Sequence, residues 1–193
     1  MSTSDIIKIV EHLFGTYGYI IIFLSSFLEI SPLGWIVPGG LILSVGGFFA
    51  YSNNLSLVAM LVFGWAGSWT VFVLAYYFGI TTGDQFIKTF KQEKNAKTAE
   101  MLLKKHGAVI LTTSMLASLT RFWVAYVAGI KHYKFSKFLV YSGLASLTWS
   151  SLMIVIGYLA GSERQDLEKS LGKTGIISWF VLLMAVGIIY FII

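Results

Sequence analysis

The chain has 193 residues, of which 56% are hydrophobic and 12% are charged, and its formal net charge is +5. Soluble domains carry about 25% charged residues, so this composition excludes a soluble protein and indicates an integral membrane protein. The positive charge suits loops that face a cytoplasmic leaflet, and we set nucleic acid aside as a partner. The chain has no cysteine, which excludes disulfides and thiolate metal sites.

The first predicted element is an amphipathic helix over residues 1–16 that lies on the membrane surface. Ile6, Ile9 and Leu13 recur at helical spacing, and charged residues stand on the opposite side. Such a helix places its apolar face in the interfacial region of the bilayer without crossing it.

The apolar tract over residues 17–51 is predicted to fold back within the membrane. It is too long and too interrupted for a single crossing, because about 20 residues span the hydrocarbon core. Its interruption holds Pro38, Gly39 and Gly40, which favour a turn, since proline lacks an amide donor and glycine tolerates unusual conformations. Glu29 stands ahead of that turn, and a carboxylate inside a bilayer is by default a functional residue.

Three further tracts are long and apolar enough to cross the membrane. They cover residues 55–80, 138–160 and 176–193. The sequence therefore predicts a single all-α membrane domain over residues 1–193, with about three full transmembrane helices.

Two basic segments decide the path of the tract between them. Residues 81–106, predicted to form a loop, hold six lysines against three acids, and residues 131–137 hold three lysines and no acid. Both segments are predicted to face the cytoplasm, because lysine accumulates on that side. Residues 107–130 must then dip into the membrane and return, with Arg121 inside and protein or water around the irregular backbone. This path puts the N-terminus on the outer side of the cell membrane and the C-terminus on the cytoplasmic side.

A weak internal repeat pairs the two predicted re-entrant segments. GYIIIFLSSFLE, from Gly18, and GAVILTTSMLAS, from Gly107, each precede a break, and GWAGSW and GLASLTW recur in the spans that follow. The charge argument puts the two segments on opposite sides of the membrane, as in the inverted repeats of transporters. Trp65, Trp69 and Trp149, inside these spans, are predicted to pack against small residues of neighbouring helices.

With these features the sequence resembles the DedA family, also called VTT-domain or SNARE-associated Golgi proteins. The resemblance covers roughly residues 15–161 and rests on three stretches: FLEISPLGWIVPGGLILSVGGFFA, GWAGSWTVFVLAYYFG and TRFWVAYVAGIKHYKFSKFLVYSGLASLTWSSLMIVIGYLAG. It implies two re-entrant segments that meet in the membrane. It also implies movement of lipids, including phospholipids and isoprenoid-phosphate carriers, between the leaflets.

The resemblance carries over Glu29 and Arg121 as site residues. Many family members have an acid directly after the Pro-Gly pair, where this chain has Gly40. Members also commonly carry an earlier arginine followed by a proline, where this chain has Met115 and Ala117. Proton coupling, which the resemblance implies for some members, is weakened by these departures.

The predicted transport site holds Glu29, Arg121, Pro38, Gly39 and Gly40. Charges at membrane depth usually pair, so Glu29 and Arg121 are expected to face each other. Two roles stay open: a structural pair that joins the two segments, or a site where Arg121 binds an anionic headgroup in place of Glu29. Pro38, Gly39 and Gly40 are first of all turn formers, although backbone amides freed there could also meet phosphate.

Three classes of function remain open. The leading prediction is a flippase or scramblase whose partners are membrane lipids with anionic headgroups. The alternative is a proton- or ion-coupled transporter of small solutes, with Glu29 as the proton carrier. A membrane-embedded lipid enzyme ranks last, because no clustered nucleophile and acid–base set is visible, and we predict no catalytic residue, metal or cofactor. A homo-oligomer stays open.

Overall fold

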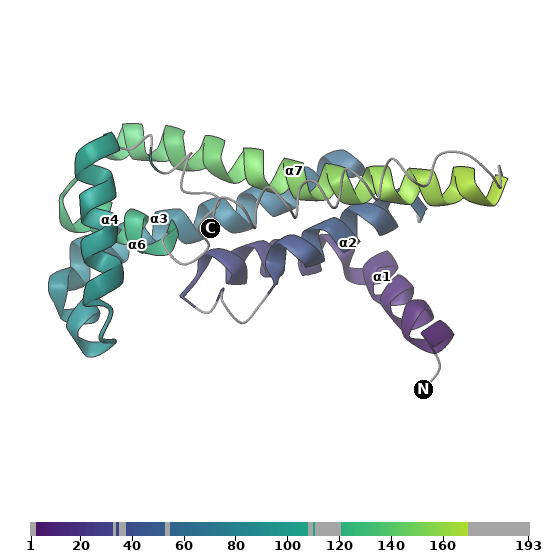
Figure 1. The fold of residues 1–193 in the computed structure, drawn as a ribbon, viewed down its shortest axis with the longest axis horizontal. Coiled ribbons are helices and arrows are strands. Elements are labelled where there is room, and N and C mark those ends of the chain that lie inside the picture. The colour runs from purple at the N-terminus through teal and green to yellow at the C-terminus, as the bar shows by residue number, and fades with distance from the viewer. Residues whose placement is uncertain are drawn as a thin grey trace.

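The computed structural model describes residues 3–32, 34, 38–52, 55–107, 110 and 121–169, and its elements are helices (Figure 1). The predicted all-α class is confirmed for these ranges. The helices are α1 (Thr3–Ile30), α2 (Gly39–Ser52), α3 (Leu57–Thr89), α4 (Glu93–His106), α6 (Arg121–Ile130) and α7 (Phe135–Lys169).

Three of these helices contain stretches that are long and apolar enough to cross a membrane. The stretches are His12–Ile30 in α1, Leu57–Thr89 in α3 and Phe135–Glu163 in α7, while α2 and α6 are shorter apolar helices. The crossings predicted at residues 55–80 and 138–160 thus coincide largely with α3 and α7. The crossing predicted at residues 176–193 lies outside the described residues.

Two local predictions differ from the structure. α1 is one helix from Thr3 to Ile30, so the predicted surface helix and the first arm of the predicted re-entrant segment are continuous. The basic segment 81–106 is helical, because it completes α3 and forms α4. Buried alanines and a leucine recur along α4 at helical spacing, which gives this lysine-rich helix an apolar stripe: Ala96, Ala99 and Leu103.

The long helices α3 and α7 run side by side in opposite directions (Figure 1). α2 lies along α7, and α4 crosses one end of the bundle beside α6. The end of α1 and the start of α2 lie partway along α7, and not at the end where α4 lies.

Two glycine crossings hold the short helices against the long ones. A Cβ on Gly47 of α2 would collide with the carbonyl oxygen of Ile154 in α7, and one on Gly157 would collide with that of Ser44. The crossing of α3 and α6 has the same pattern, with Gly79 against the Tyr126 carbonyl and Gly129 against the Tyr76 carbonyl. Each crossing therefore depends on a reciprocal pair of glycines that lets two parallel helix backbones approach.

A kink in α3 ties its end to α6. Gly83 has φ 52° and ψ −140°, a conformation that residues with a Cβ avoid, and it interrupts the helical geometry inside α3. The Tyr126 hydroxyl donates to the Gly83 carbonyl at 2.7 Å and also contacts Thr82 Oγ1 at 2.6 Å. The kink therefore fixes the position of α6.

Candidate functional site

The structure brings Glu29 and Arg121 together in the interior of the bundle. Glu29 lies in the last turn of α1 and is 5% exposed, and Arg121 is the first residue of α6 and is 3% exposed. Arg121 Nη1 lies 3.5 Å from Glu29 Oε1. Of the two ion pairs among the described residues, this one is buried and the other is half-exposed. The juxtaposition expected from the sequence is therefore present.

Trp149 of α7 completes the pair. Its Nε1 donates to Glu29 Oε1 at 3.0 Å, and Arg121 Cζ lies 4.3 Å from the centre of its ring. The indole thus contacts the anion through its N–H and the cation through its face. The sequence predicted Trp149 only as a packing residue. The signal that could have revealed it is that an indole N–H inside a bilayer needs an acceptor, and Glu29 was the predicted acid at that depth.

The start of α2 faces the carboxylate. A Cβ on Gly39, the first residue of α2, would lie 2.7 Å from Glu29 Oε2, so the carboxylate lies against the bare backbone there. The N-terminal end of a helix carries a partial positive charge, which favours an anion at this position. Pro38 directly precedes α2, and its carbonyl accepts from the amides of Leu41 and Ile42 in the first turn, at 3.0 and 3.1 Å.

Gly40 points elsewhere. A Cβ added there would lie 3.3 Å from Trp149 Cζ2 and 3.4 Å from Met153 Sδ, so this position faces α7. The predicted set therefore divides into Glu29, Arg121 and Gly39, which converge, and Pro38 and Gly40, which shape and pack α2. Met115 and Ala117, where the family resemblance implies an arginine and a proline, lie outside the described residues.

A cavity of about 10 Å³ lies beside the ion pair. Arg121 and Trp149 border it, as do Ser68 of α3, Ser146 of α7 and three apolar residues: Ile30, Phe72 and Ala145. This volume is about the size of one water molecule. Sequence reasoning did not single out either serine, because two spans do not reveal which of their faces meet.

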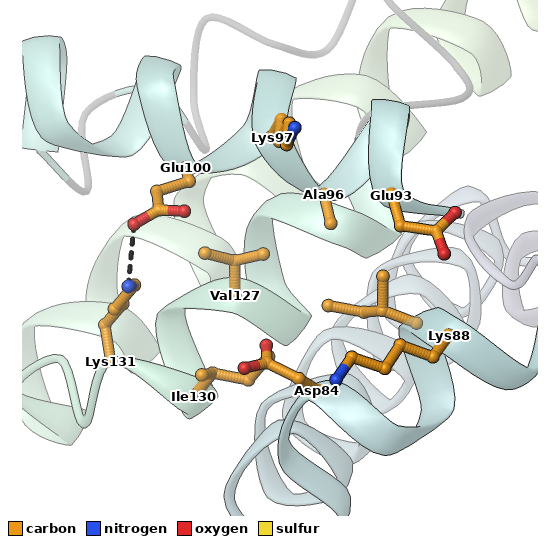
Figure 2. A pocket seen from close by; sticks show the side chains of 10 residues that line it. Asp84, Lys88, Glu93, Ala96, Lys97, Glu100, Val127, Ile130 and Lys131 are labelled. Atoms are coloured by element: carbon orange, nitrogen blue, oxygen red, sulfur yellow. Dashed lines mark ion pairs between the residues drawn. The ribbon is translucent and has the colours of Figure 1, made fainter. Parts of the chain in front are cut away.

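A second cavity, of about 210 Å³, lies among α3, α4 and α6 (Figure 2). Three acids and three lysines line it: Asp84, Glu93, Glu100, Lys88, Lys97 and Lys131. Lys131 Nζ lies 2.6 Å from Glu100 Oε1, and both side chains are about half-exposed. The hydrogen bond from Lys131 to Glu100, with the attraction between their charges, raises the pKa of Lys131. The balanced charges suit a solvated face that joins α4 to α6.

Comparisons with known proteins identify the family of this chain. The VTT domain family matches residues 37–159, which hold α2, α3, α4, α6 and most of α7. The chain belongs to the VTT-domain, or DedA, family of membrane proteins. The family resemblance expected from the sequence is thereby confirmed. Gly39, Arg121 and Trp149 lie within the matched residues, and Glu29 lies ahead of them.

Curated relatives cover most of the chain at low identity. Undecaprenyl phosphate transporter A of Bacillus subtilis is 24% identical over 163 residues, which are 82% of each chain. An uncharacterized membrane protein of Synechocystis is 27% identical over 193 residues, 96% of this chain and 87% of the relative. Protein DedA of Escherichia coli is 26% identical over 160 residues, 77% of this chain and 71% of the relative. No solved structure matches the chain.

Proposed function

We propose that this VTT-domain protein moves lipids with phosphate-bearing headgroups between the leaflets of the membrane, past Glu29 and Arg121. The observation that carries the proposal is the buried Glu29–Arg121 pair, placed where α1, α2, α6 and α7 meet among helices of membrane length. The name of the Bacillus subtilis relative, an undecaprenyl phosphate transporter, supports the same class of cargo.

The pair suits exchange of one anion for another. An unpaired charge at this depth costs about 2.5–3.5 kcal/mol. The Glu29 carboxylate offsets that cost for Arg121 when no lipid is bound. A phosphate that replaces Glu29 keeps Arg121 paired during passage. The planar guanidinium can donate two parallel hydrogen bonds to a phosphate, which a lysine ammonium cannot reproduce.

The two breaks in the chain belong, in this proposal, to re-entrant segments over residues 17–51 and 107–130 that form an inverted repeat. α2 and α6 both begin at the site, with Gly39 and Arg121 as their first residues. Gly47 and Gly129, the glycines of the two crossings, each follow eight residues later. Each short helix thus packs on the long helix of the other half, which supports the repeat. Most of the second break, residues 108–109 and 111–120, lies outside the described residues.

We infer the orientation from the lysines of residues 81–106 and 131–137, which would face the cytoplasm and place the N-terminus outside. The chain has no cysteine, so single cysteines report cleanly. Ser56 and Lys134 are both exposed and directly precede α3 and α7, which run in opposite directions and so begin at opposite ends of the bundle. Cysteines at these two positions should react with an impermeant reagent from opposite sides of the membrane. Labelling of both from one side would overturn this topology.

Liposomes that carry tail-labelled fluorescent lipids test the function. In protein-free vesicles, a quencher confined to the outer leaflet leaves the label of the inner leaflet fluorescent. When the labelled lipid bears a phosphate, we expect the protein to move it to the outer leaflet, so that the quencher removes this remaining fluorescence as well. Arg121→Lys should abolish the effect while the protein stays folded. No gain over protein-free vesicles with the unmodified protein would refute the proposal. A pH dye and an assay for released phosphate, in the same vesicles, detect the ion-transport and enzyme alternatives.

A further inference from the structure

Ser68 and Ser146 occupy matching places in the two halves of the molecule. Ser68 lies eleven residues before Gly79, and Ser146 lies eleven residues before Gly157, so each has the same spacing to its crossing glycine. Their side chains border the same small cavity, together with Arg121. The packing of the bundle therefore brings both serines to one point beside the ion pair.

The hydroxyls of these two serines differ from those of three other buried serines. Ser25, Ser26 and Ser142 each donate to a backbone carbonyl of the preceding turn. Ser68 is fully buried and Ser146 is 2% exposed, yet neither hydroxyl has a hydrogen-bond partner among the described residues. A buried polar group without a partner is costly, so two such groups at one cavity beside an arginine call for an explanation.

We propose that Ser68 and Ser146 are the residues that select a phosphomonoester headgroup, by donating hydrogen bonds to the phosphate oxygen that the Arg121 fork does not bind. This inference rests on the proposed function. A guanidinium fork binds two oxygens of a phosphate. A phosphodiester has only two non-bridging oxygens, whereas a monoester has a third, which the two hydroxyls receive. The cavity has the volume of one oxygen-sized group, as this arrangement requires.

Alanine substitutions with a matched control test the inference. Ser150 is also fully buried on α7 and also lacks a partner among the described residues, but it does not border the cavity. We compare Ser68→Ala, Ser146→Ala, the double variant and Ser150→Ala in liposomes with tail-labelled phosphatidic acid, a monoester, or phosphatidylglycerol, a diester. The double variant should exchange phosphatidic acid about tenfold more slowly, at an unchanged rate for phosphatidylglycerol. Ser150→Ala should match the unmodified protein for both lipids.

A second readout separates this inference from the proposed function. Short-chain phosphatidic acid should raise the melting temperature of the unmodified protein in detergent and should have less effect on the double variant. The inference is overturned if the double variant keeps the full exchange rate and the full thermal shift. It is equally overturned if exchange of both lipids falls alike in the double variant and in Ser150→Ala, since that marks a packing defect. If the unmodified protein exchanges no lipid, the proposed function fails, and the thermal shift alone decides the serine site.

Discussion

The helices α2 and α6 hold corresponding places in the fold, but their surroundings differ. Residues 121–129 of α6 are all buried, because α3, α4 and the site enclose this helix. α2 packs on α1, α3 and α7 and leaves Leu41 64% exposed. α6 is therefore confined along residues 121–129, whereas α2 is less confined at Leu41.

This difference assigns different tasks to the two arms. The confined helix, α6, carries Arg121. The less confined helix, α2, carries Gly39, against which the Glu29 carboxylate lies. A shift of α2 would alter the support of Glu29 while Arg121 stays in place. We therefore expect the anion of the pair to be the exchangeable partner and the cation to be the fixed one. The following predictions test this asymmetry.

The largest effect should come from removing the fixed cation. Arg121→Met leaves Glu29 buried without its cation, and loss of one partner of a buried pair costs about 3–5 kcal/mol of stability. The double variant Glu29→Met, Arg121→Met removes both charges and should recover most of that loss without recovering lipid exchange. Melting temperatures in detergent and exchange in liposomes measure the two effects. If Arg121→Met alone were as stable as the unmodified protein, Arg121 would not be the tightly confined partner of the pair.

The two glycine crossings should differ in tolerance. Gly129→Ala adds a methyl group that meets the Tyr76 carbonyl on a helix with no room to retreat, so its cost should lie near the top of the usual overpacking range of about 1–3 kcal/mol. Gly47→Ala meets a carbonyl as well, but α2 is less confined than α6, and we expect a cost near the bottom of that range. Gly143→Ala is the control, since its Cβ would lie 3.4 Å from Trp69 Nε1 in ordinary contact. Equal melting temperatures for Gly129→Ala and Gly47→Ala would remove the asymmetry.

The features that depend on charge and on breaks in the chain could be predicted from the sequence. The features that depend on which face of each helix meets its neighbour could not. Glu29 and Arg121 could be paired because charges at membrane depth need partners and the lysines constrained the path of the chain. Trp149 and the two serines stayed hidden, because the faces that meet are set by glycine contacts over 100 residues apart, such as Gly47 with Ile154. The helical state of residues 81–106 could have been read from the spacing of Ala96, Ala99 and Leu103, but the lysines masked it.

A smaller effect should follow at the start of α2. Gly39→Ala places its methyl group against the Glu29 side chain and should displace the carboxylate from Arg121, at a cost of about 1 kcal/mol. Gly40→Ala is the matched control, because its methyl group would meet only the edge of Trp149 and the flexible Met153, and its cost should be a few tenths of a kcal/mol. Lipid exchange should change for Gly39→Ala alone. The same exchange rate in both variants would show that Gly39 does not position Glu29.

The smallest effect should come from the ion pair that joins α4 to the residue after α6. Both Glu100 and Lys131 are about half-exposed, so Lys131→Met should cost no more than the 0.2–1 kcal/mol typical of exposed pairs, and less at high salt. Because Glu100 raises the pKa of Lys131 in the folded protein, the pair's contribution is complete below the unfolded lysine pKa of about 10.4. It is lost as the pH rises through the higher folded pKa. The melting-temperature difference between the unmodified protein and Lys131→Met should therefore be constant near neutral pH and shrink above about pH 10.4. A large difference that persists in high salt would mean that this exposed pair, and not the apolar stripe of α4, keeps α6 enclosed.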